Sequence, residues 1–298
     1  MRPTAGVGAR SSVLLRRSRS ESGRVNPTDQ FIARRAFGNT YQLGQTVPKL
    51  DWADLNTMGK GFTGKTCVYC CDAKSVAGDH VFARKLFLAS RRANLPKVPA
   101  CKSCNGQKSE LEHYVTTVLP FGGRHTDAAK NLVSMVPKRL EKNTALHTLL
   151  QRGMKRAWTR EKGLLMRTGS VPFDWPMVEQ WLVFVVKGLA WHHWKVLIGS
   201  DFSVEIFALT SHGEAVFQRL LTMPAAERIR QDVGAGTFSY EAAQGLDIPQ
   251  ISVWEFSIYG GVKLRDRTAP EHTVSKIGAM VGPKRVPETA KLTAMGPQ

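Results

Sequence analysis

Two Cys-x-x-Cys pairs constrain this chain more than any other feature of its sequence. Cys67 and Cys70 form the first pair, and Cys101 and Cys104 form the second. A Cys-x-x-Cys turn sets two thiolates about one tetrahedral edge apart, so two such turns can enclose a Zn²⁺ ion. A closed four-sulfur site leaves no position for a substrate and contributes folding free energy. We therefore expect a structural zinc ion, with any chemistry arising from residues between and beside the pairs.

Polar residues follow the two cysteine pairs in a defined order. Asp79 and His80 come after the first pair, Asn94 follows in the intervening segment, and Asn105 comes directly after the second pair. This order resembles that of the HNH (His-Asn-His, ββα-metal) endonucleases, in the subset whose finger is braced by a structural zinc ion. The resemblance is confined to residues 65–115. It implies an α+β fold that contains a ββα-metal finger.

Individual positions match the motif of that family. His80 matches the first His, Asn94 the middle Asn, and Asn105 the last position, where members have either His or Asn. Ala83 stands where some members have Pro, which is a change in a turn and not at a reactive group.

The resemblance also implies a catalytic divalent ion. Asp79 would supply a carboxylate oxygen and Asn105 an amide oxygen, and such hard ligands suit Mg²⁺ or Mn²⁺. Ser109, one turn beyond Asn105, is not a second imidazole, which favours Mg²⁺ over a transition metal. His80 would act as the general base, because an imidazole with a pKa of ~6.5 accepts a proton from water near neutral pH. Asn94 would hold the loop that bears the histidine.

Basic residues near this motif are candidates for nucleic-acid binding. Arg84, Lys85 and Lys108 are expected to contact the phosphates that flank the cleaved bond. The whole chain has a formal net charge of +18 and a pI near 10.0. Such a charge attracts polyanions, and double-stranded DNA is the expected partner. Basic composition alone is also found in ribosomal and membrane-surface proteins, so it does not by itself select an enzyme.

The distribution of cysteines and apolar residues bounds the cellular setting. All five cysteines lie between residues 67 and 104, so a disulfide framework across the chain is excluded and a reducing cytoplasm is expected. Cys71 is interpreted as a bystander thiol. No segment reaches the ~18 consecutive apolar residues of a membrane span, so no membrane partner is expected.

Composition and periodicity divide the chain into five parts. Residues 1–50 carry nine Lys or Arg against two Asp or Glu, with weak periodicity, which is typical of a disordered basic arm. The expected organisation is a mostly disordered arm (1–50), an HNH nuclease domain with a four-cysteine zinc site (51–120), a helical region (121–199), a small α+β unit (200–266) and a loose tail (267–298).

Local signals predict the elements within these parts. Helices are expected over residues 105–118, 126–136 and 143–162, and the strongest helix begins at Asp174, where an N-cap is followed by Pro176. Its apolar residues repeat every three or four positions and predict a buried stripe: Val178, Trp181, Leu182, Val185, Val186 and Leu189. The aromatic and histidine residues 191–194 are interpreted as packing residues. Beyond them we expect strands at 202–208 and 251–259, with helices at 213–221 and 225–232.

These observations predict a metal-dependent endonuclease that hydrolyses phosphodiester bonds of DNA. The alternative is a zinc-knuckle protein that binds nucleic acid without catalysis. A nuclease needs Asp79, His80 and Asn105 in one place, whereas a binding protein needs none of them. The sequence leaves open the target, the preference between DNA and RNA, the oligomeric state and the biological context.

Overall fold

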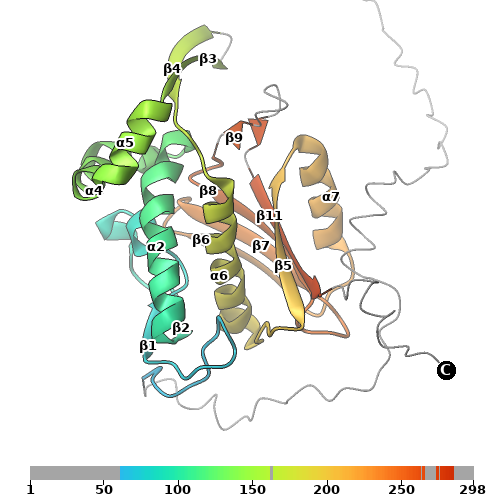
Figure 1. Cartoon of the computed structure of the whole chain (residues 1–298). Helices are drawn as coiled ribbons and strands as arrows, with labels where there is room; N and C mark the ends of the chain where they lie inside the picture. Colours follow the sequence, from blue (N-terminus) through green and yellow to red (C-terminus); the bar gives the residue numbers. More distant parts are fainter. Residues whose placement is uncertain (1–60, 162–163, 263, 266–272, 275, 285–298) are drawn as a thin grey trace, which may run out of the picture.

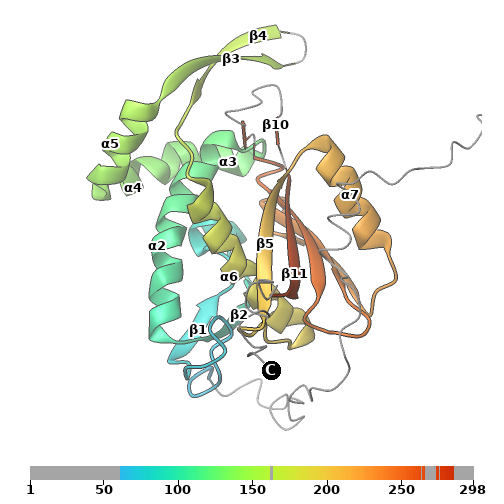
Figure 2. The same ribbon diagram turned by 45° about the vertical axis from the view of Figure 1, so that its right-hand side comes forward.

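The structure is a computed structural model that describes residues 61–161, 164–262, 264–265, 273–274 and 276–284. In this part of the chain, a cysteine-rich unit and the long helix α6 lie beside a five-stranded antiparallel sheet, and helix α7 covers the other face of that sheet (Figures 1 and 2). The predicted mixed α+β class is confirmed. The predicted disordered arm, residues 1–50, lies outside the described residues.

The cysteine-rich unit consists of two short strands followed by a helix. Strands β1 (Ala77–His80) and β2 (Lys97–Ala100) pair antiparallel, with His80 opposite Lys97. The segment between them contains the 3-10 turns η2 (Arg84–Leu86) and η3 (Ala89–Arg91). Helix α2 (Lys102–Val118) then begins just after Cys101 and ends in the 3-10 turn η4 (Leu119–Gly122). The helix predicted over 105–118 is therefore confirmed.

The region after α2 is less helical than predicted. Helices α3 (Thr126–Ser134), α4 (Val136–Lys142) and α5 (Thr144–Gly153) follow in turn. The helix expected over 143–162 is wrong in its second half, because β3 (Lys155–Glu161) pairs with β4 (Leu164–Ser170) as an antiparallel hairpin. Gly153 ends α5 where the chain meets Pro172, and a Cβ atom on this glycine would lie 2.6 Å from the proline Cγ.

Helix α6 (Trp175–Trp194) is the central helix of the molecule and begins where the sequence predicts. The side chain of its N-cap, Asp174, accepts a hydrogen bond from the backbone N–H of Met177, and Pro176 occupies the first turn. The predicted apolar stripe is completely buried: Val178, Trp181, Leu182, Val185, Val186 and Leu189. Among the described residues, no helix has the length and apolar character needed to cross a membrane.

The sheet has the strand order β5-β11-β8-β7-β6. Its strands are β5 (Phe202–Leu209), β6 (Arg228–Val233), β7 (Phe238–Gln244), β8 (Ser252–Ile258) and β11 (Lys276–Pro283). Helix α7 (Ser211–Thr222) connects β5 to the rest, and the short strands β9 (Leu264–Arg265) and β10 (Thr273–Val274) pair with each other.

Three of the elements predicted in this region are confirmed and one is wrong. The strands expected at 202–208 and 251–259 and the helix at 213–221 correspond to β5, β8 and α7. The helix expected at 225–232 is replaced by strand β6, in which only Ile229 is buried. This edge strand has mostly polar side chains, and its pairing with β7 decides its conformation.

The loose tail expected from residue 267 is wrong for the part that the structure describes. Residues Lys276–Pro283 form β11, an interior strand between β5 and β8. The sequence does not predict this strand, because it contains glycines at 278 and 282 and glycine is uncommon inside strands. Gly278 has a packing reason: a Cβ atom there would lie 2.4 Å from a ring carbon of Phe217 in α7.

Both faces of the sheet are covered, which explains why its inner strands read as continuous apolar runs. In β8, Trp254 and Phe256 belong to the core shared with α6, whereas Val253 packs with α7. In β11, Ala279 belongs to the core shared with α6, and Met280 packs with α7. The larger core also contains buried residues of the cysteine-rich unit. The boundaries predicted at 120 and 199 therefore lie within a shared core.

We expect Gly278→Ala to lower the free energy of unfolding by about 1–3 kcal/mol, the usual result of overpacking a filled core. Urea denaturation of the purified full chain measures this value. Gly169→Ala is the matched control, because Gly169 also lies in a strand but an added Cβ would meet no atom within 4 Å. Equal stability of the two variants would contradict the packing of α7 on β11.

The residues at the end of α6 pack against the sheet, as predicted. The ring centroids of Trp194 and Trp254 lie 4.9 Å apart. His193 Nε2 lies 2.8 Å from the hydroxyl oxygen of Tyr240. That hydroxyl donates its hydrogen to Gln231, so His193 donates through Nε2. Burial, reinforced by His192 and Lys195, lowers the pKa of His193 to about 4.

This depressed pKa predicts a loss of stability in acid. An unfolded histidine has a pKa of ~6.5, so as pH falls from 6.5 the unfolded chain binds this proton before the folded chain does. The contribution of neutral His193 is complete above pH 6.5 and is lost as pH falls towards 4. We expect wild type to lose stability relative to His193→Gln, which keeps a donor but cannot titrate, as pH decreases over this range. Unfolding free energies measured at a series of pH values test this, and a constant difference would contradict it.

Candidate active site and metal centre

The four cysteines of the two pairs meet at one point. The sulfur atoms of Cys67, Cys70, Cys101 and Cys104 all lie within 4.8 Å of one another. A tetrahedral zinc ion with Zn–S bonds of about 2.3 Å needs sulfurs roughly 3.8 Å apart, so this group can hold such an ion with small adjustments. Cys67 and Cys101 are buried, whereas Cys70 is exposed. The structure therefore supports the predicted ligand set.

Local hydrogen bonds explain why the pairs converge. Cys101 is the N-cap of α2, and its sulfur accepts a hydrogen bond from the backbone N–H of Cys104. The N–H of Val68, in the first pair, donates to the carbonyl oxygen of Pro99 in β2 at 3.0 Å. The first turn is thus attached to the strand that leads directly into the second.

Removal of the metal should unfold this unit. We expect about one Zn²⁺ per chain and predict that Cys101→Ser abolishes both zinc binding and the cooperative thermal transition, since the ion contributes folding free energy. Metal analysis and circular dichroism of the purified chain measure the two effects.

Cys71→Ser provides the matched control. Cys71 follows a ligand directly, but its sulfur donates to the carbonyl oxygen of Ile198 at 3.4 Å and lies outside the four-sulfur group. Serine keeps a donor there, so this variant should retain its zinc. A folded Cys101→Ser protein without zinc would exclude the structural role of the ion.

A buried lysine joins the strand that bears Asp79 and His80 to helix α2. The ammonium of Lys108, only 1% exposed, lies 2.9 Å from Asp79 Oδ2 and donates to the carbonyl oxygen of His80 at 2.6 Å. It also pairs with Glu112, one turn further along α2. The prediction that Lys108 contacts phosphates is therefore wrong for this structure, because its charge is used inside the protein.

Two further residues of this cluster were not predicted as site residues. Tyr69, between the first two cysteines, donates from its hydroxyl to Asp79 Oδ2 at 2.7 Å. Glu112 is the second carboxylate on Lys108, and burial raises its pKa although Lys108 opposes this effect. The four-residue spacing from Lys108 is the one sequence signal that indicates Glu112. Nothing in the local sequence indicates Tyr69.

His80 lies at the end of β1 among cationic side chains. Its pKa is lowered, first by partial burial and then by the positive charges of Lys97 and Arg84. The imidazole is therefore neutral and able to accept a proton at neutral pH. Arg84 and Lys85 are exposed, as a phosphate-binding role requires, and Lys97 is an additional exposed cation opposite His80 in the hairpin.

The two asparagines of the motif occupy different environments. Asn105 lies in the first turn of α2, and the helical repeat puts it on nearly the same side as Glu112, two turns later. Its role as a metal ligand beside Asp79 stays a prediction. Asn94 is exposed and has a φ of 58°, a left-handed conformation that asparagine tolerates better than most residues. Its role in holding the His80 loop stays a prediction.

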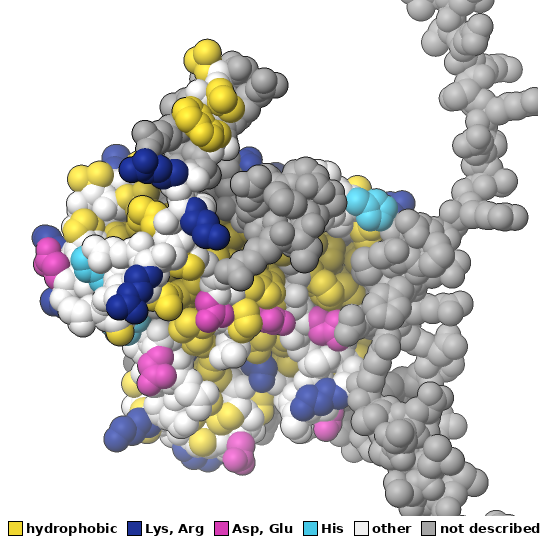
Figure 3. Space-filling view, turned by 45° about the horizontal axis from the view of Figure 1, so that its top comes forward, with side chains coloured by type: hydrophobic (Ala, Val, Ile, Leu, Met, Phe, Trp, Pro, Cys, Tyr) yellow, Lys and Arg dark blue, Asp and Glu magenta, His cyan; other side chains and the backbone are white. Residues whose placement is uncertain are grey.

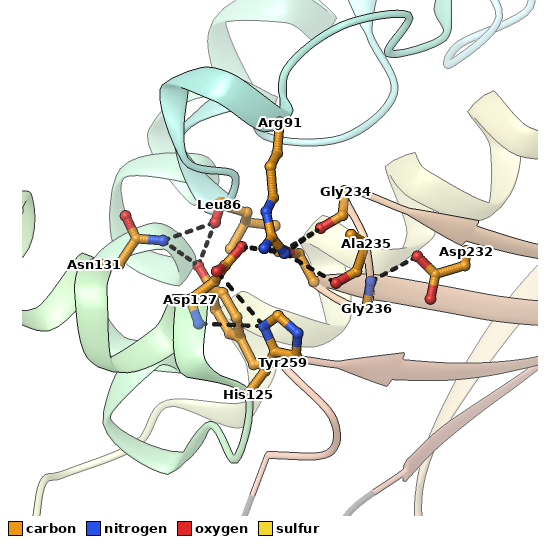
Figure 4. Close-up of polar contacts among 11 residues, drawn as sticks. Leu86, Arg91, His125, Asp127, Asn131, Asp232, Gly234, Ala235, Gly236 and Tyr259 are labelled. Atoms are coloured by element: carbon orange, nitrogen blue, oxygen red, sulfur yellow. Dashed lines mark hydrogen bonds and ion pairs between the residues drawn. The ribbon is translucent and has the colours of Figure 1, made fainter.

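The segment that follows His80 is attached to the remainder of the protein at several points. The carbonyl oxygen of Leu86 accepts hydrogen bonds from Asn131 Nδ2 at 2.9 Å and from the Tyr259 hydroxyl at 2.6 Å (Figure 4). Arg139, in α4, donates to the carbonyl oxygen of Lys85 at 2.8 Å. Helices α3 and α4 and the end of β8 therefore determine where this segment lies.

An ion pair between a partly exposed arginine and a buried carboxylate completes the attachment. Arg91 lies 3.0 Å from Asp127 Oδ2, and the same guanidinium nitrogen donates to the carbonyl oxygens of Gly234 and Ala235 in the β6–β7 turn (Figure 4). Asp127 is completely buried and also accepts from the hydroxyl of Thr237 at 3.0 Å. Loss of Arg91 would leave an unpaired buried charge, so the pair fixes the segment firmly against the sheet.

No protein-family model, curated protein or solved structure matches this chain. The resemblance to HNH endonucleases therefore rests on the sequence motif.

Proposed function

We propose that this protein is a metal-dependent endonuclease that hydrolyses phosphodiester bonds of DNA. One observation carries the proposal: a histidine with a lowered pKa ends a strand beside Asp79, next to a helix that presents Asn105, among exposed Arg84 and Lys97. The strand–strand–helix order and the cysteine group agree with the ββα-metal arrangement that the motif implies.

In this proposal His80 is the general base. Its neutral imidazole removes a proton from a water molecule, and the resulting hydroxide attacks phosphorus in line with the leaving 3′ oxygen. The P–O3′ bond breaks, and the 3′ oxygen takes a proton from solvent. Arg84, Lys85 and Lys97 bind the flanking phosphates and keep the strand in position.

Asp79 and Asn105 would hold Mg²⁺ or Mn²⁺, which supplies positive charge at the phosphate and the leaving oxygen when bound. The donor types fit, because a carboxylate and an amide oxygen are ligands that hard cations prefer. Tyr69 and Lys108 both contact Asp79 through Oδ2. Tyr69 and Lys108 would therefore keep the carboxylate in one orientation while it holds the ion.

The second candidate is a zinc-braced protein that binds DNA without cutting it. The contact between Lys108 and Asp79 favours this alternative, since an ammonium at 2.9 Å already neutralises the carboxylate. The two candidates differ in whether any divalent ion supports cleavage.

We expect purified wild type to nick supercoiled plasmid with Mg²⁺ or Mn²⁺ and to stop when EDTA is added. His80→Ala should cut roughly 10²–10⁴-fold more slowly, the usual contribution of a general base, with its zinc content and DNA affinity unchanged. Asp79→Ala and Asn105→Ala should need more Mg²⁺ for the same rate. Gel assays over a range of ion concentrations measure these effects.

His113→Ala is the matched control, because this histidine also belongs to the cysteine-rich unit but is exposed on α2. It should cut like wild type. If wild type binds DNA yet no divalent ion supports cleavage, or if His80→Ala cuts as fast as wild type, the nuclease proposal fails. The first outcome would leave the binding protein as the function.

A further inference from the structure

The β3–β4 hairpin projects from the body of the protein at the end of the molecule away from β1 and β2 (Figures 1 and 2). Its strands pair with each other in a sheet of their own. An isolated two-stranded ribbon is marginally stable in water and gains stability from a partner. We refer to these two strands, residues 155–161 and 164–170, as the β3–β4 arm.

The arm exposes large apolar side chains that a free surface would be expected to avoid. Trp158 is 65% exposed and Leu165 is 64% exposed. Figure 3 shows hydrophobic side chains on the projecting arm and Lys or Arg side chains near its base. Exposed apolar groups that cluster in this way indicate a binding surface.

The register of the hairpin puts cationic and apolar side chains on one face. Trp158 pairs with position 167, and Leu165 pairs with position 160. Because side chains alternate between the faces of a ribbon, Arg156, Trp158 and Leu165 belong to the same face, and all three are exposed. An arginine, a tryptophan and a leucine thus share one exposed face of the hairpin.

This mixture fits nucleic acid better than a protein or a membrane. The two strands of the arm contain four Lys or Arg and one Glu, and this excess of positive charge attracts a polyanion such as DNA. Membrane-surface elements separate apolar and cationic side chains onto opposite faces. Here they share a face, as they do where cations contact phosphates and an apolar wedge or aromatic ring contacts bases.

We infer that the β3–β4 arm binds double-stranded DNA by lying in a groove, with Arg156 on a phosphate and Trp158 against the base pairs. A two-stranded ribbon has the width of the major groove. This inference rests on the proposed function and identifies the element that binds the DNA substrate. The arm is at the far end of α2 from the cysteine group (Figure 1), so it acts on affinity and leaves the cleavage rate of bound DNA unchanged.

The test compares substitutions on the two faces in the full-length protein. Arg156→Gln and Lys155→Gln remove the same charge at adjacent exposed positions, but on opposite faces. Trp158→Ala and Leu164→Ala form a second matched pair. Fluorescence anisotropy with a labelled 30-base-pair duplex at several salt concentrations gives the dissociation constant and the salt slope. Single-turnover cleavage with saturating protein gives the rate for bound DNA.

We expect Trp158→Ala to weaken duplex binding by roughly tenfold, the lower end of the range for losing one contact to a base edge. Arg156→Gln should reduce the slope of log K against log salt by about 0.9, the value for one lost phosphate contact. Lys155→Gln and Leu164→Ala should bind like wild type, and all four variants should keep the wild-type rate at saturation.

The outcomes separate this inference from the proposed function. If wild type cuts DNA but all four variants bind equally well, the arm is not the binding element and the inference fails alone. The same holds if Trp158→Ala affects single-stranded DNA or vesicles of anionic phospholipid but not the duplex. If wild type neither binds nor cuts DNA, the proposed function fails, and zinc content and a cooperative unfolding transition show that the sample was folded.

Discussion

Helix α6 must be buried on almost every side, and this requirement holds the molecule together. Its apolar side chains belong to the same core as Trp254 and Phe256 of the sheet and Phe82 of the segment after His80. The ring centroid of Phe82 lies 4.6 Å from that of Phe238 in β7, and the ring centroid of Trp181 lies 6.2 Å from the same point. Fully burying each such side chain contributes about 1.5–3 kcal/mol. The small cysteine-rich unit thus gains a much larger hydrophobic core.

Close contacts show how α6 positions the candidate site. Gly188 faces Val81, the residue directly after His80, and a Cβ atom there would lie 3.0 Å from the valine methyl groups. On the preceding residue, Lys187 donates to the carbonyl oxygen of Tyr69 at 2.8 Å. Tyr69 in turn orients Asp79. The helix therefore contacts both ends of the cluster around Lys108, and a shift of α6 would move the residues assigned to chemistry.

Lys108 illustrates what a motif can and cannot predict. Its position three residues after Asn105 fits the family pattern, and the net charge of the chain favours reading each lysine as a phosphate contact. In the folded chain two carboxylates and a carbonyl oxygen surround its ammonium. A buried ammonium requires such compensation, because removing it from water unpaired is very costly. Burial cannot be read from residue type, so the sequence alone does not separate Lys108 from the exposed Arg84.

Local signals in the sequence were sufficient for the cysteine group, for α2 and for α6, because each depends on spacing, capping or helical period over a few residues. They failed for β3, β6 and β11, whose conformation depends on strands distant in the sequence or on an unusual residue. Arg228–Val233 is polar and Lys276–Pro283 contains two glycines, so neither has the alternation typical of a strand. The sequence by itself identified the four cysteines that converge and the order of the motif. Only the tertiary structure decided which charges are buried and which strands complete the five-stranded sheet. It alone also showed that the β3–β4 hairpin projects from the body of the protein. These features depend on contacts between segments that are distant in the sequence.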